Sequence, residues 1–337
     1  MLFRSDAAGV RQFPAGMRER YLRQGPVLTE VSYAGHSADG ALSHEVTVSL
    51  WRTDDYVRGL YHLRLDVLKA TSPSRLALFQ VGSDTYNCIA TPKLAWGNVA
   101  GLQKEWDAEP GGNEYKGPAI ELTGRAPWVS QHEAVPAPSE PSGAIANRGL
   151  LVREWTAQLG GKPASPWARE RGVHATGING TVVDLVLPPD VKELQPGDFV
   201  EATFEQVILP QFQRDYYGPN EALRMALGKW ENTWQLLQRE AAGNDVACKV
   251  ERGILKRLWP ALIQVDETGQ AEFSLTGGLG YLPVTFTGLK DYRLPVLEEG
   301  LPGGEWQVVD QSVHGSDFWQ TNRSEEHTSE LQSRQSI

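Results

Sequence analysis

The sequence predicts an all-β protein built from stacked antiparallel sheets, as a sandwich or a supersandwich. Residues 45–50 and 61–67 alternate apolar and polar side chains with a period of two, which is typical of half-buried strands. Gly, Pro, Asn and Asp separate most strand-like segments, as turns require. Because parallel strands need long crossover segments, about a dozen closely spaced strands favour antiparallel sheets.

The other strand candidates are residues 27–33, 75–81, 119–123, 128–132, 150–156, 181–187, 199–209, 258–265, 271–275 and 281–286. Two loops stand out, at 107–117 and at the Pro-rich 135–143. A Pro-rich stretch is typical of a linker or an insertion. We therefore expect one continuous domain or two packed parts, 6–134 and 144–322, that divide near 135–143.

One long amphipathic helix is predicted over residues 219–242. Its larger apolar residues recur every three or four positions and so form one stripe: Leu223, Leu227, Trp230, Trp234 and Leu237. A proline begins the segment and a glycine follows it, as is common at helix ends. We expect the two tryptophans of the stripe to pack in the core.

The composition excludes several classes of protein. With 40% hydrophobic and 22% charged residues, the chain is neither disordered nor a coiled coil, and no apolar run is long enough to span a membrane. The net charge of -10 has the wrong sign for a nucleic-acid-binding protein. Nucleotide-binding and metalloprotease motifs are absent, so we expect no cofactor and no metal. Cys88 and Cys248 are too few for a zinc cluster, and we expect two buried thiols, with a single bridge as the alternative.

Both ends of the chain resemble a translated sequencing adapter. Residues 323–333 read RSEEHTSELQS, which matches one frame of a common library adapter, and the adapter's reverse complement translates to the residues at positions 2–5. We therefore expect residues 1–5 and 323–337 to be non-native and the rest to be a slice of a longer gene. The polar tail lacks the apolar surface needed to order it, so it should pack against nothing.

Tryptophan is abundant, with 11 residues in the chain. The indole ring stacks on apolar faces and its N–H donates to polar groups, so exposed tryptophans suit sugar binding. Four lie nearest to turns and polar segments and are candidates for a surface groove: Trp96, Trp106, Trp128 and Trp319. The alternative is that each tryptophan fills space between the sheets.

Polar residues of the types that a carbohydrate lyase needs cluster in the first half of the chain. Tyr86 and Asn87 follow the strand at 75–81, His132 ends the strand at 128–132, and Arg148 precedes the strand at 150–156. Such side chains can neutralise a uronate, remove a proton and protonate the leaving oxygen. The alternative is ordinary turn hydrogen bonding, with His132 satisfied at a strand edge.

Paired carboxylates are the competing chemistry, because a glycoside hydrolase needs two of them. The eligible side chains are Asp54, Asp55, Asp84, Glu133, Asp215 and Asp317.

The tryptophan-rich, glycine-punctuated antiparallel pattern resembles the sandwich and supersandwich portions of large bacterial carbohydrate-active proteins. The resemblance implies a polysaccharide or oligosaccharide ligand, flanking domains outside this slice, and a secreted or periplasmic location. It favours a fragment of a polysaccharide-processing enzyme, a lyase or a glycoside hydrolase. The alternative is a non-catalytic β-sandwich that binds glycan or supports a catalytic domain.

Overall fold

The computed structural model describes residues 3–5, 11–25, 27–51, 57–82, 93–132, 146–175, 178–210, 237–238, 240–242, 246–277, 282–289, 296–300, 304–309, 320–323 and 329–335. These residues form mostly strands, and most strand pairs are antiparallel, which confirms the predicted fold class. One departure is the parallel pairing of β19 (Ala261–Gln264) with β21 (Leu282–Leu289).

The chain forms two compact units. Unit 1 comprises Met1–Arg20, Val31–Val48 and Asp54–Ala242, and unit 2 comprises Tyr21–Glu30, Ser49–Thr53 and Gly243–Ile337. The units do not separate near 135–143, where the sequence suggested a division. The strands on either side of that segment pair with each other, and Val129 lies opposite Leu150.

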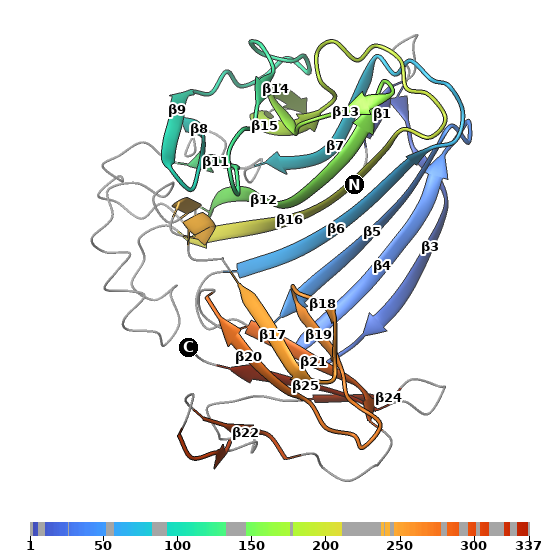
Figure 1. Cartoon of the computed structure of the whole chain (residues 1–337). Coiled ribbons are helices and arrows are strands. Elements are labelled where there is room, and N and C mark those ends of the chain that lie inside the picture. The colour runs from blue at the N-terminus through green and yellow to red at the C-terminus, as the bar shows by residue number, and fades with distance from the viewer. Residues whose placement is uncertain are drawn as a thin grey trace. The chain divides into compact units, whose positions relative to one another are not determined.

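The largest sheet has ten strands, and the central ones run side by side in Figure 1. In spatial order they are β3 (Pro14–Arg23), β4 (Leu28–Ser37), β5 (Leu42–Trp51), β6 (Val57–Val67), β16 (Phe199–Pro210), β12 (Ala146–Leu159), β11 (Trp128–His132), β8 (Lys93–Asn98) and β9 (Gly101–Asp107), with β13 (Lys162–Pro163) paired to β12. We call this the large sheet.

A second sheet of six strands lies entirely within unit 1. Its order is β10 (Ile120–Glu121), β14 (Trp167–Ala175), β15 (Ile178–Val186), β7 (Arg75–Gly82), β1 (Phe3–Ser5) and β2 (Arg11–Gln12). Leu65 and Phe204 of the large sheet share one buried cluster with Leu78 and Leu185 of the second sheet. The core of unit 1 therefore lies between the two sheets, as in a β-sandwich.

The other face of the large sheet carries a second apolar cluster. Trp128, Leu151 and Val207 pack there against Leu237 and Ala241. Residues 237–238 and 240–242 are helical, but the structure does not show the long helix predicted over 219–242, and the rest of that range lies outside the described residues. Among the described residues, no helix is long and apolar enough to cross a membrane.

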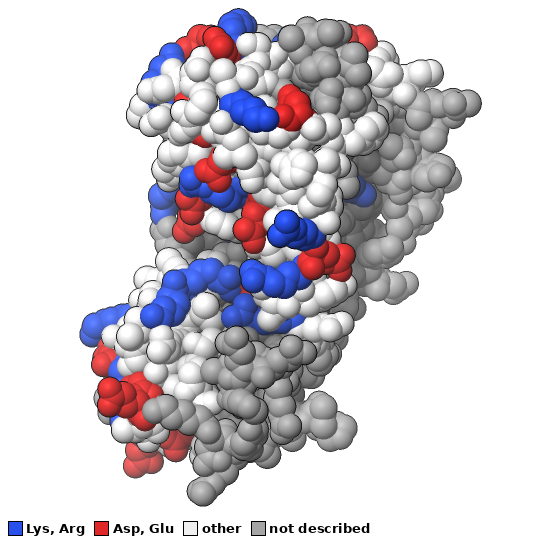
Figure 2. All heavy atoms as spheres, turned by 90° about the vertical axis from the view of Figure 1, so that its right-hand side faces the viewer, with Lys and Arg blue, Asp and Glu red and all other residues white. Residues whose placement is uncertain are grey.

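Strand β3 forms one edge of the large sheet. Arg18, Glu19 and Arg20 follow one another along its exposed middle. Charged side chains on an edge strand oppose pairing with another chain. Figure 2, which views the molecule from the side where β3 lies, shows acidic side chains beside basic ones on this face.

Unit 2 contains three small sheets. They comprise the pair β17 (Ala247–Arg252) and β20 (Glu272–Thr276), the five-stranded order β18 (Ile254–Arg257), β19, β21, β25 (Ser329–Gln335) and β24 (Gln320–Arg323), and the pair β22 (Glu298–Glu299) and β23 (Gln307–Val308). Ile263, Val284 and Phe286 are central to its apolar cluster.

A buried carboxylate also organises unit 2. Glu30 is fully buried and pairs with Arg23 and, at 2.8 Å, with Arg257, while Ser49 Oγ donates to it at 2.7 Å. Burial raises the pKa of Glu30, but the two guanidinium charges outweigh burial and hold it below the usual value. The charged form of Glu30 is therefore part of the folded unit.

The expectation that residues 323–337 pair with nothing is wrong. Strand β25 lies between β21 and β24, with Val284 opposite Ser333 and Asn322 opposite Glu330. At the other end, β1 pairs with β7 and β2. Backbone hydrogen bonds can hold a polar strand in a sheet without apolar side chains, which is the contribution that the compositional argument left out. The resemblance to an adapter thus rests on the sequence match alone.

We expect a chain that ends at Asn322 to melt several degrees below the full chain, because the truncation removes β25 from between β21 and β24. Both neighbouring strands then lose their backbone hydrogen bonds to β25, and each such bond contributes a net of about 0.5–1.5 kcal/mol. Scanning calorimetry of both chains tests this, and melting temperatures within about one degree of each other would show that β25 adds no stability to the sheet.

Candidate functional site

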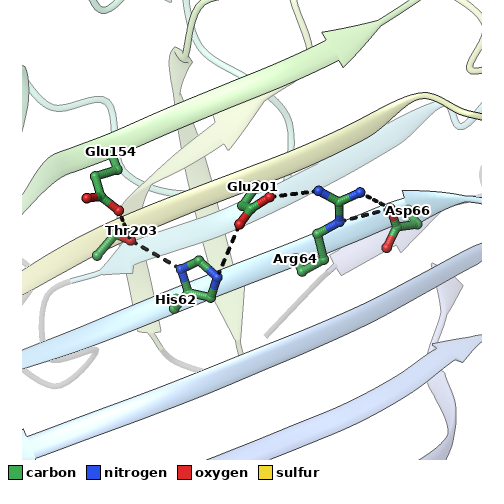
Figure 3. A network of polar contacts seen from close by, with 6 residues as sticks. All are labelled: His62, Arg64, Asp66, Glu154, Glu201 and Thr203. Atoms are coloured by element: carbon green, nitrogen blue, oxygen red, sulfur yellow. Dashed lines mark hydrogen bonds and ion pairs between the residues drawn. The ribbon is translucent and has the colours of Figure 1, made fainter. Parts of the chain in front are cut away.

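The alternation of side chains along three adjacent strands creates a polar surface on the large sheet. On β6, Leu63 and Leu65 point into the core, so His62, Arg64 and Asp66 lie on the opposite face. Glu201 and Thr203 of β16 and Glu154 of β12 lie on the same face (Figure 3). We call these six residues the sheet-face network.

A threonine joins one half of the network. Thr203 Oγ1 donates to Glu154 Oε2 at 3.0 Å and lies 3.2 Å from His62 Nδ1. Since the single hydroxyl hydrogen is directed to Glu154, His62 Nδ1 is the donor to Thr203. His62 Nε2 then faces Glu201 Oε1 at 3.8 Å. The histidine thus bridges β6 and β16 in a defined tautomer.

Arg64 joins the other half. Its Nη1 donates to Glu201 Oε2 at 2.8 Å, and its Nε and Nη2 donate to Asp66 Oδ1 at 2.9 and 2.6 Å. The hydrogen bond to Asp66 is the main reason that the pKa of Arg64 lies above its ordinary value. The guanidinium group lies 4.5 Å from the centre of the Phe199 ring. Two carboxylates and an aromatic ring therefore fix the orientation of Arg64.

The network is open to solvent. His62 is 46% exposed, Glu201 49% and Arg64 38%, whereas Thr203 beneath them is buried. Its exposed groups offer carboxylate acceptors next to guanidinium donors, with the His62 ring beside them, on three paired strands. Such a surface can bind a ligand that donates and accepts hydrogen bonds at neighbouring positions.

Further along the same face, a second set of charges is closed to solvent. Arg153 Nε donates to Glu205 Oε2 at 2.6 Å, and Arg58 Nη1 lies 3.3 Å from Glu240 Oε1. Both glutamates are fully buried, and burial raises the pKa of Glu205. We call these four residues the Glu205 cluster. Its two carboxylates, Glu205 and Glu240, lie close to shared arginines, but both are closed to solvent and therefore to a polysaccharide.

The structure describes two of the four predicted lyase residues. His132 is fully buried between Ser130 Oγ and Glu105 Oε1, each 2.9 Å from a ring nitrogen. Arg148 Nη1 donates to the carbonyl of Gly82 at 2.6 Å. Tyr86 and Asn87 lie outside the described residues. His132 is thus hydrogen-bonded within the sheet, on a strand that pairs on both sides, and not at a strand edge. The catalytic roles of the four residues stay predictions.

The predicted sugar-stacking tryptophans divide between core and periphery. Trp128 is fully buried in the second apolar cluster, and its Nε1 donates to the carbonyl of Asn98 at 3.4 Å. Trp96 and Trp106 are partly buried against the main core. Trp106 also donates to Glu170 at 2.9 Å. Trp128 therefore presents no ring face to a groove, and Trp319 lies outside the described residues.

The sequence interpretation missed the sheet-face network as a site. His62, Arg64 and Asp66 were visible in the sequence as the polar half of the alternating segment 61–67. Thr203 and Glu201, the partners of His62 and Arg64 on β16, are 141 and 137 positions away, and no local pattern indicates which strands are neighbours. The six carboxylates considered for hydrolase chemistry all lie outside the described residues. Within the described chain, no group of His, Cys, Asp and Glu side chains could hold a metal ion.

Comparison with known proteins finds similarity among solved structures. No family model and no curated protein matches the chain. Among solved structures, it is similar to the galactosidase domain of the α-galactosidase–sucrose kinase AgaSK, at 10% identity and a TM-score of 0.36, covering 64% of this chain and 30% of that one. It is also similar to the α-galactosidase from Lactobacillus brevis, at 12% identity and a TM-score of 0.32, covering 62% and 29%. The chain thus spans less than a third of either structure, and at these TM-scores neither carries an argument about its site or activity.

We expect the stability of the protein to fall as the pH drops below about 6.5, in part because of His132. Burial lowers the pKa of His132 below the ordinary value of 6.5, although Glu105 opposes the shift. The unfolded chain therefore binds a proton in a pH range where the folded chain does not, so stability rises with pH through that range.

The measurement is urea unfolding of the natural chain and of His132→Gln at pH 5 and pH 7. The variant should lose part of the pH dependence, whereas His174→Gln, at an exposed histidine, should retain it. Equal pH dependence in His132→Gln and the natural chain would contradict the assignment.

Proposed function

We propose that the chain binds a glycan on the sheet-face network, as a β-sandwich part of a longer polysaccharide-processing protein. The observation that supports this proposal is the solvent-exposed set of interlocked donors and acceptors across β6, β16 and β12. A sugar ring presents several hydroxyl groups, each of which can both donate and accept a hydrogen bond. Glu201, Arg64 and His62 offer matching groups within one small area.

The side chains of the sheet-face network are already held in place before a ligand binds. Glu201 and Asp66 hold Arg64 from two sides, and Phe199 supports its guanidinium plane. Side chains that are already ordered lose less entropy when a ligand binds. Glu201 and Glu154 retain free lone pairs beyond the bonds within the network, because a carboxylate has about four acceptor positions.

A catalytic function is the second candidate. The Arg148 side chain contacts the carbonyl of Gly82, the residue directly before the segment that carries Tyr86 and Asn87. Arg148 also lies opposite Gln131, the neighbour of His132. These contacts support a lyase-type set at one end of β7, β11 and β12.

Substitution of the network tests the binding function. Arg64→Gln and Glu201→Gln should each weaken glycan binding by about tenfold or more, because each removes a charge-assisted hydrogen bond worth about 1.5–3 kcal/mol. The melting temperature should barely change, since exposed ion pairs contribute little to stability. Isothermal titration calorimetry against a panel of neutral oligosaccharides measures the affinity.

Lys162→Gln is the matched control. It removes an ion pair with Asp190 that is more exposed than the network and lies on β13, away from it. This variant should bind as the natural chain does. Undiminished binding by both network variants, or no binding to any glycan in the panel, would contradict the proposal.

A spectroscopic assay tests the second candidate. If the four residues act together, incubation with uronate polysaccharides should give the absorbance of unsaturated uronate. Tyr86→Phe should then lower the rate by about 100-fold or more, as expected for the loss of a proton-transfer group. Absence of this absorbance with every uronate polysaccharide in the panel would contradict the catalytic function.

A further inference from the structure

The outward face of the second sheet carries a separate charged cluster. Strand alternation places Arg169 and Arg171 of β14 on the face that bears Asp184 of β15. Asp184 lies opposite Arg169 on one side and opposite Gln80 of β7 on the other. Together with Arg75 and Tyr115, these residues form what we call the Asp184 cluster.

Asp184 is shared by two arginines. Its Oδ2 lies 3.2 Å from Arg75 Nη2 and 3.0 Å from Arg171 Nε, and Gln80 Nε2 donates to its Oδ1 at 2.7 Å. The carboxylate is fully buried, whereas the side chain of Arg75 is 25% exposed. Asp184 is therefore closed to solvent, and Arg75, which binds it, is partly exposed at the surface.

The loop at 107–117 brings Tyr115 to this cluster. Tyr115 forms an isolated antiparallel bridge with Arg171, and Gly172 N donates to the carbonyl of Glu114 at 3.1 Å. The loop passes so close to β14 that a Cβ atom at Gly172 would collide with the carbonyl of Gly111. The absence of a side chain at Gly172 thus allows the loop to lie against the strand.

Two guanidinium groups lie over the Tyr115 ring, that of Arg169 at 4.9 Å and that of Arg75 at 5.7 Å from its centre. Burial and the charge of Asp184 raise the pKa of Tyr115 to about 12. The phenol is therefore protonated at neutral pH and adds no negative charge. Its ring therefore contacts both guanidinium groups.

The charges of this cluster do not balance. The cluster contains three guanidinium groups and one carboxylate, which pairs with Arg75 and Arg171. Arg169 Nε donates to the carbonyl of Gly117 at 2.8 Å, and no carboxylate in the described part of the chain pairs with Arg169. The Nε atom of Arg75 is buried and has no hydrogen-bond partner among the described residues. Arg75 therefore retains hydrogen-bonding capacity beyond its contact with Asp184.

We propose that the Asp184 cluster binds the carboxylate of an acidic sugar between Arg75 and Arg169. Guanidinium groups bind carboxylates in a planar, two-pronged geometry, and here two of them lie 4.9 and 5.7 Å from the centre of one phenol ring. The inference rests on the proposed function in that the ligand is a glycan residue. It adds a second site, on a different sheet, that distinguishes acidic from neutral sugars.

Titration calorimetry with sodium glucuronate, glucose and sodium sulfate tests the proposal. Glucuronate should bind and glucose should not bind at this site. Arg169→Gln should weaken glucuronate binding by about tenfold or more, as expected for the loss of a charge-assisted pair. Arg75→Lys retains the positive charge next to Asp184 but loses the two-pronged geometry, so it should weaken glucuronate binding as well. This second variant keeps the test valid if Arg169→Gln fails to fold.

Arg64→Gln is the matched control, because it changes an arginine of the sheet-face network. It should leave glucuronate binding intact, while Arg169→Gln should leave the binding of neutral oligosaccharides intact. Failure of one site is thereby distinguished from failure of the other. Glucuronate binding that persists in both Arg169→Gln and Arg75→Lys would overturn the proposal, and so would sulfate binding as tight as that of glucuronate, which would identify a site for free anions.

Discussion

The antiparallel ladder of β6, β16 and β12 is the constraint on which the rest of unit 1 depends. Because successive residues of a strand point to opposite faces, fixing Val200, Ala202 and Phe204 in the core fixes Glu201 and Thr203 on the other face. A shift of the register by one residue would bury the charges and expose the core. The burial of apolar surface between the sheets therefore also holds the polar network in its geometry.

The two ends of that outward face differ in their exposure to water. At one end, Leu237 and Ala241 cover the sheet, and the Glu205 cluster must satisfy its charges internally. Desolvation of buried ions costs several kcal/mol per ion, so these pairs serve the fold only when they stay together. At the other end, His62 and Glu201 keep their contact with solvent. Hydrated charges can exchange water for a ligand without that penalty, which is why the open end is the better candidate for binding.

Strands with strong local signals could be predicted from the sequence. The expected segments 75–81, 128–132 and 199–209 correspond closely to β7, β11 and β16. Strand β14 was not predicted, because its inward positions include Glu170 and Gly172, which interrupt the apolar alternation. Glu170 is buried through bonds to Trp106 and to the backbone of Glu109, partners that only the folded chain brings near. The pairing of strands distant in sequence is likewise set by tertiary packing.

Two of the predicted site residues, Trp128 and His132, lie in the interior of unit 1. Trp128 and His132 share one face of β11, and both are fully buried there. Burying the large apolar ring of a tryptophan stabilises a core, and such a ring is then not available to stack on a sugar. Trp128 is buried in this way, because Leu151 and Val207 pack with it in one apolar cluster. Charged side chains follow the opposite rule, since burial is costly to them unless every charge is paired. In a sandwich with one shared core, the outward faces of the two sheets are therefore where unbalanced charge collects, and Arg64 and Arg169 each lie on one of them.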